Sequence, residues 1–174
     1  MKYDLHKSLA ILDRTPAVLR QLLQGLDDAW LMNNEGPDTF SPFDVLGHLV
    51  HGEKTDWTAR IKLILKHGNT KAFEKFDRFA MYEESEGKTI NQLLDEFEKL
   101  RKENLDWLKS LSLTTTDLDK KGLHPVLGEV TLENLLATWV VHDLTHISQI
   151  SRVMAKQYKE AIGPWTEFFR ILHF

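Results

Sequence analysis

The sequence contains no cysteine among its 174 residues. This absence excludes disulfide bonds, a cysteine nucleophile, a CxxC redox pair, a thiolate zinc site and an iron–sulfur cluster. A metal ion would have to be bound by His, Asp or Glu, and the chain has eight histidines. Its length is sufficient for one domain to bury a hydrophobic core without disulfide cross-links, so we expect a single domain over residues 1–174.

The chain also lacks an excess of positive charge and long apolar runs. Its 22 Lys and Arg against 26 Asp and Glu give a formal net charge of −4, which argues against broad capture of nucleic acid or anionic membranes. No run approaches the roughly 18 apolar residues of a membrane span, and the first residues have no apolar signal region. We therefore expect a cytoplasmic protein with no membrane or nucleic-acid partner.

Helical periodicity runs through almost the whole sequence. Several helix starts are marked by a Ser or Thr that precedes Pro directly or has Asp or Gln three residues later. The expected helices are one over 5–26 that is kinked or divided at an N-cap Thr15 before Pro16, one from Pro42 to about Lys66, one from Thr89 to about Leu111, one from Thr131 to about Lys156, and a short one after Gly163-Pro164. Brief strands are expected only within Gly122–Val130. The pattern predicts an all-α four-helix bundle.

The connection from His67 to Lys88 is too long for a simple turn between helices, and such segments often form pocket walls or lids. Its three phenylalanines, at positions 73, 76 and 79, could dock onto the bundle. Arg78 lies among them. It could bind an anionic group of a substrate, or it could form a solvated salt bridge with Asp77 or a glutamate.

Two histidines of the last long helix are spaced to meet. His142 and His146 lie one turn apart on one face, and the helix is apolar on nearly every side. A helix of that kind is buried, and buried polar groups need partners. Two imidazoles at this spacing can bind one metal ion. Alternatively, they are core or surface histidines satisfied by other groups.

A third histidine strengthens the metal interpretation. His48 in the second helix shares its face with small residues, so another helix could approach closely. His51 faces a more polar edge, which makes His48 the better candidate ligand. Three neutral imidazoles would leave a divalent metal with open coordination positions, as in catalytic sites, where it can acidify water, bind a thiolate or polarise a carbonyl.

Two further residues are candidate catalytic groups. Gln149 follows His146 on the same side and could bond a ligand or substrate, or pair with a buried carbonyl. Glu53 is either a general base or the partner of a basic residue such as Arg60. Asp44 could orient the ring of His48, although its place in the first turn of its helix also fits a capping role.

The chain resembles the DinB-like superfamily of helical metalloproteins, which includes thiol S-transferases and metal-dependent hydrolases. The resemblance rests on five segments: Asp44–Leu49, Phe76–Phe79, His124-Pro125, Thr138–Gln149 and Gly163–Trp165. It implies a four-helix bundle, a homodimer and a metal triad at His48, His142 and His146. It also implies a divalent metal, with nickel or zinc preferred over iron or manganese.

Two functions follow from the residues and the resemblance together. The first is an enzyme whose three-histidine centre activates a thiol or water to attack a small electrophilic substrate, as an S-transferase or a hydrolase. Because the chain has no cysteine, the sulfur of a thiol reaction would come from a low-molecular-weight cosubstrate. The alternative is a non-enzymatic protein that binds a metal or small molecule in a stress response.

Overall fold

The computed structural model describes residues 2–173, so the two ends of the expected domain, residues 1 and 174, lie outside it. Its elements follow the chain in this order: α1 (Leu5–Leu12), α2 (Thr15–Leu23), α3 (Asp28–Leu31), α4 (Pro42–Thr55), α5 (Trp57–His67), η1 (Gly68–Thr70), α6 (Met81–Ser85), α7 (Ile90–Ser110), α8 (Thr115–Leu118), β1 (Lys121–His124), β2 (Gly128–Thr131), α9 (Leu132–Gln157), η2 (Gly163–Phe168) and η3 (Arg170–Leu172).

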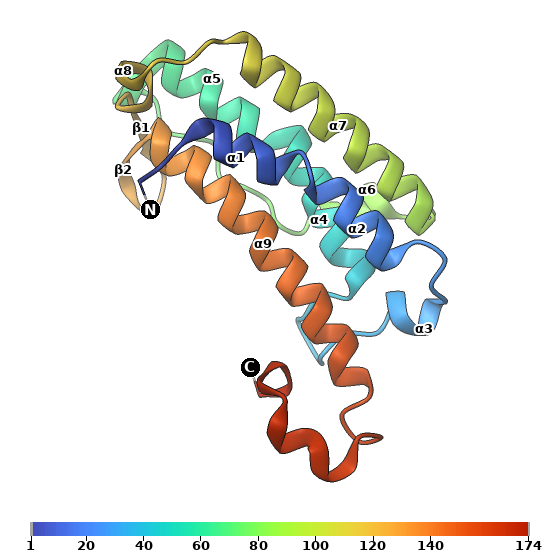
Figure 1. Cartoon of the computed structure of the whole chain (residues 1–174). Helices are drawn as coiled ribbons and strands as arrows, with labels where there is room; N and C mark the ends of the chain where they lie inside the picture. The colour runs from blue at the N-terminus through green and yellow to red at the C-terminus, as the bar shows by residue number, and fades with distance from the viewer. Residues whose placement is uncertain (1, 174) are drawn as a thin grey trace.

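Four rods make up the body of the molecule: α1 with α2, α4 with α5, α7, and α9 (Figure 1). The antiparallel hairpin of β1 and β2 lies beside α5 and the start of α9. At the other end, the chain after α9 turns away from the bundle (Figure 1). The predicted all-α four-helix bundle is confirmed.

The first rod is divided at Pro16, as expected. Proline has no N–H, so the carbonyl of Leu12 cannot receive the hydrogen bond that would continue the helix. The predicted N-cap is wrong by one residue, because Thr15 lies inside α2 and Arg14 precedes it. The hydroxyl of Thr15 donates to the Ile11 carbonyl at 3.3 Å instead.

The second rod differs from the prediction of one helix to about Lys66. It bends at Asp56, which separates α4 from α5. The hydroxyl of Thr55 donates to the carbonyl of His51 at 2.9 Å, and such back-bonding by Thr is a recognised cause of helix bending. The bend places Trp57 at the start of α5, facing α9.

The third and fourth rods begin where the sequence predicts. Thr89 forms a capping box with Gln92 at the start of α7, and Thr131 forms one with Asn134 at the start of α9. The brief strands also form in the expected segment. The short C-terminal helix is two 3₁₀ turns rather than an α-helix, the first beginning at Gly163.

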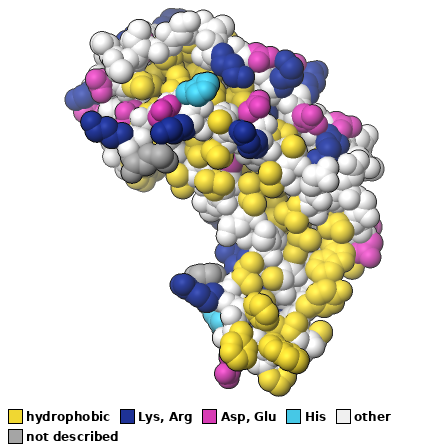
Figure 2. All heavy atoms as spheres, viewed as in Figure 1, with side chains coloured by type: hydrophobic (Ala, Val, Ile, Leu, Met, Phe, Trp, Pro, Cys, Tyr) yellow, Lys and Arg dark blue, Asp and Glu magenta, His cyan; other side chains and the backbone are white. Residues whose placement is uncertain are grey.

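Apolar side chains form two core clusters, one at each half of the bundle. The cluster near the hairpin contains Trp57, Leu105 and Trp139, and the other contains Leu46 and Phe97, so α7 and the α4–α5 rod contribute to both. Between residues 2 and 173, no helix is long and apolar enough to cross a membrane. Exposed apolar side chains gather at the end of the molecule that carries the C-terminal 3₁₀ turns (Figure 2).

Candidate metal centre

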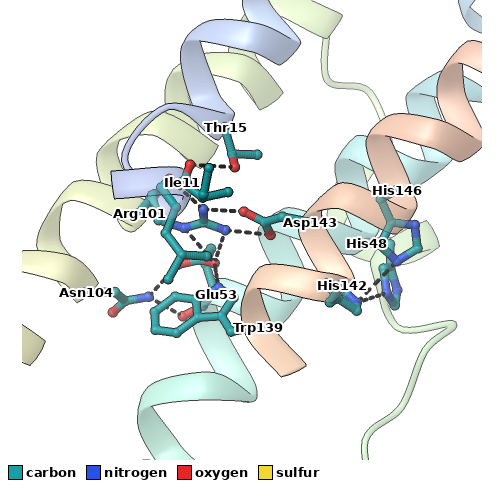
Figure 3. Close-up of polar contacts among 11 residues, drawn as sticks. Ile11, Thr15, His48, Glu53, Arg101, Asn104, Trp139, His142, Asp143 and His146 are labelled. Carbon is teal, nitrogen blue, oxygen red and sulfur yellow. Dashed lines mark hydrogen bonds and ion pairs between the residues drawn. The ribbon is translucent and has the colours of Figure 1, made fainter. Parts of the chain in front are cut away.

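Three imidazoles converge from two helices (Figure 3). His48 extends from α4, and His142 and His146 extend from successive turns of α9. The Nε2 atom of His142 lies 3.1 Å from Nε2 of His48 and 3.1 Å from Nε2 of His146. The two helices pack together here, so residues 94 positions apart in the sequence share one site.

These distances fit three ligands of one metal ion. Zinc–nitrogen bonds of about 2.0–2.1 Å in a tetrahedron place neighbouring nitrogens roughly 3.3 Å apart. Nδ1 of His146 contacts Oε1 of Gln149 at 2.8 Å. If Nδ1 carries the proton and donates it to that oxygen, Nε2 keeps its lone pair and points it toward the other two rings. The Nδ1 atoms of His48 and His142 are buried without a hydrogen-bond partner in the part of the chain that the structure describes.

The surroundings of the three rings favour their neutral form. Burial lowers the pKa of His48 to about 4, and the charges of the neighbouring imidazoles and of Arg78 act in the same direction. Burial also lowers the pKa of His142 strongly. The pKa of His146 is lowered by burial as well, partly opposed by its hydrogen bond to Gln149. Neutral imidazole is the form that binds metals.

The centre is closed on one side and open on another. Trp57 packs edge-on against the ring of His142, with ring centroids 5.1 Å apart. Phe76 packs edge-on against His48 at 5.4 Å. The rings of His142 and His146 are only half-buried, so this side of the centre reaches solvent. A pocket of about 270 Å³ lies behind Phe76 and has His51 in its wall.

A buried cluster of ion pairs lies beside the histidines, because Asp143, one of its members, follows His142 in α9 (Figure 3). All five guanidinium N–H groups of Arg101 have acceptors: Glu53 and Asp143 receive two each, and the carbonyl of Leu12 receives one at 2.8 Å. Glu53 also accepts from the indole of Trp139 at 3.1 Å. The carbonyl of Leu12 is the one that Pro16 leaves unpaired, so Arg101 joins all four rods at one level.

Comparison with known proteins agrees with this architecture. A family model described as the DinB superfamily matches residues 11–150. The chain belongs to the DinB superfamily. A solved structure described as "YfiT from Bacillus subtilis is a probable metal-dependent hydrolase with an unusual four-helix bundle topology" superposes with a TM-score of 0.75 at 24% identity, covering 94% of this chain and 90% of that one. No curated protein matches the sequence significantly.

The structure places the two candidate catalytic residues of this superfamily member in different surroundings. Gln149 contacts a ring of the centre directly, through His146. Glu53 lies in the buried cluster, where both carboxylate oxygens accept hydrogen bonds, and its basic partner is Arg101 rather than Arg60. Arg60 pairs with Asp56. The catalytic roles of Gln149 and Glu53 remain predictions.

Several other sequence interpretations can be compared directly with the structure. Asp44 forms a capping box with Ser41, as its place in the first turn suggested. His51 is buried but points away from the centre, toward Glu84 at 2.8 Å. His124 accepts hydrogen bonds from the turn that follows it. His6, His67 and His173 are exposed.

Sequence reasoning missed Arg101, which holds the cluster beside the centre. A signal was present, because Arg101 continues an apolar stripe of α7 that includes Phe97, Leu105 and Leu108. An arginine inside such a stripe is buried and needs carboxylate partners. Those partners lie 48 and 42 residues away in the sequence, so the stripe alone could not name them.

Proposed function

We propose that this protein is a metal-dependent enzyme in which His48, His142 and His146 bind a divalent metal that activates a thiol or water for attack on a small electrophilic substrate. The observation that carries the proposal is that one ring nitrogen from each of the three histidines lies within 4.8 Å of the other two. A bound metal would supply Lewis acidity, which lowers the pKa of a water or thiol at neutral pH. Three neutral ligands would leave the full charge of the ion available for this purpose.

The chain contributes orientation and exclusion of water. Gln149 would hold the His146 ring in one tautomer, and Trp57 and Phe76 limit the movement of the other rings. Imidazole ligands suit zinc, nickel and iron, and the resemblance to the superfamily favours nickel or zinc over iron or manganese. YfiT, described as a probable metal-dependent hydrolase, favours the hydrolytic form of the reaction. An S-transferase would require a low-molecular-weight thiol as cosubstrate, because the chain has no cysteine.

Elemental analysis of untagged protein tests the metal site. Wild-type protein should hold about one metal ion per chain, and His142→Ala should hold far less because two ligands bind a divalent ion weakly. His51→Ala is the matched control, since this buried histidine lies one turn from His48 but points toward Glu84. Equal metal content in wild type and His142→Ala would contradict the proposal.

Activity is tested on metal-loaded protein with a panel of thiols and model electrophiles, and with esters and amides for hydrolysis. Turnover should disappear in His146→Ala. Gln149→Leu should weaken metal binding about 10- to 100-fold, because it removes the group that orients a ligand. Glu53→Gln tests the role of that carboxylate as a base: turnover retained by the variant would exclude the role, and turnover lost by a variant that is folded by circular dichroism and still binds metal would support it. A wild-type protein that binds metal but has no activity in any assay would favour the non-enzymatic alternative.

We also propose that the protein is a homodimer. Exposed apolar side chains occur half-way along α9, at Val141 and Leu144, and on the C-terminal 3₁₀ turn, at Trp165 and Phe168, and exposed apolar surface often marks an interface. Light scattering after gel filtration should give about twice the chain mass. Leu144→Arg should reduce it, whereas an arginine at the exposed hairpin residue Val126 should not.

A further inference from the structure

A set of aromatic rings surrounds His48 on the side of the loop that precedes α6. Phe76 packs edge-on against the His48 ring at 5.4 Å, and Phe40 packs against it at 5.8 Å. Tyr82 packs edge-on against Phe40 at 6.2 Å, and Phe79 stacks on Tyr82 at 6.3 Å. We call these four rings the aromatic collar. Its outer members, Phe79 and Tyr82, are 52% and 46% exposed, so part of each ring is accessible to a ligand beside their mutual contact.

Arg78 lies at the outer edge of the aromatic collar. Its guanidinium carbon is 4.6 Å from the centre of the Phe79 ring. Asp77, the carboxylate next to it in the sequence, accepts a hydrogen bond from the Phe79 main chain at 3.0 Å. Across residues 2–173 no ion pair links Arg78 to a carboxylate, so the salt bridge expected with Asp77 or a glutamate is not formed.

Other arginines of the molecule are used differently. Each of the following pairs with at least one carboxylate: Arg20, Arg60, Arg101 and Arg152. Arg78 instead places its guanidinium beside the exposed ring of Phe79, which the contacts of Tyr82 and Phe40 connect to His48. A guanidinium has a planar fork of donors that matches the oxygens of a carboxylate, sulfonate or phosphate, and it retains this capacity when stacked on an aromatic ring.

We propose that Arg78 and the aromatic collar bind the substrate of the centre, which we infer to be a small organic molecule with an oxyanion group attached to a planar or apolar portion. The guanidinium would bind the oxyanion, and the exposed parts of the Phe79 and Tyr82 rings would pack against the apolar portion. This inference rests on the proposed function, because it assigns the substrate class of the same centre.

Calorimetric titration with two simple probes tests the inference. Benzenesulfonate carries an anionic group that coordinates metals weakly, and methyl phenyl sulfone is its neutral counterpart of similar shape. Wild-type protein, both metal-free and zinc-loaded, should bind benzenesulfonate about tenfold tighter than the sulfone, as expected for a charge-assisted bidentate contact. Arg78→Gln should abolish this preference, and Phe79→Ala should weaken binding of both probes.

Lys75→Gln is the matched control, because Lys75 is an exposed cation of the same loop whose ammonium lies over no aromatic ring among residues 2–173. It should leave the preference for benzenesulfonate intact. An unchanged preference in Arg78→Gln, or an equal loss in Lys75→Gln, would overturn the inference. The outcome is separate from that of the proposed function: elemental analysis decides whether metal is bound, whereas the metal-free titration decides whether Arg78 selects anions.

Discussion

Replacement of Arg101 by Met should be among the most destabilising single changes in this chain. The side chain is 1% exposed and donates all five of its N–H groups. Met fills most of the volume but leaves Glu53 and Asp143 as two buried carboxylates without a cation, and it leaves the carbonyl of Leu12 without a donor. Removal of one member of a buried ion pair typically costs about 3–5 kcal/mol, which is a large part of the roughly 5–15 kcal/mol that stabilises a domain.

Urea unfolding followed by circular dichroism measures this cost. Arg20→Met is the matched control, because Arg20 also bridges two carboxylates of α7, Asp95 and Glu98, but both are exposed. That change should cost less than about 1 kcal/mol. Arg101→Lys should fall between the two, since it restores the charge without the planar fork. Equal costs for Arg101→Met and Arg20→Met would refute the reasoning that burial decides the value of this cluster.

Three further predictions concern stability. Gly122→Ala should cost about 1–3 kcal/mol in thermal unfolding, because its Cβ would lie 2.6 Å from Cγ1 of Ile64 and 2.8 Å from the Phe73 ring; Phe73→Leu in the same chain should recover part of the loss. Arg152 holds the pKa of Glu35 at about 2, below its usual 4.5, so this stabilisation is present above pH 4.5 and is lost as the pH falls through about 2. Glu35→Gln should therefore cost about 1 kcal/mol at pH 7 and almost nothing near pH 2, measured by urea titration at each pH. Added zinc or nickel should raise the melting temperature of wild type but not of His142→Ala, because a ligand that binds the folded state stabilises it.

The features that the sequence predicted well depend on neighbouring residues. Ser41, Thr89 and Thr131 cap their helices within one turn, so the start of each long helix could be located from the residues beside it. The break at Pro16 follows from one missing N–H. His142 and His146 lie on one helix, where a spacing of four residues is enough to predict that their rings are adjacent.

The features that were missed depend on residues far apart in the chain or on small changes in the backbone. The partners of Arg101 lie on three other rods, and no local pattern identifies them. The bend at Asp56 arises from one side-chain hydrogen bond of Thr55 that competes with regular helix geometry. The sequence correctly predicts that His48, and not His51, lies on the helix face suited to a metal ligand. Only the packing of α4 on α9 brings His48 to the other two histidines.

The acceptors of Arg101 also have a consequence for the order of folding. They lie 89, 48 and 42 residues from it in the sequence, so the buried cluster is completed only after distant segments have met. Contacts of such long range are costly to form early, because loop closure must precede them. We therefore expect the cluster to be absent from the folding transition state, and its loss to accelerate unfolding far more than it slows folding.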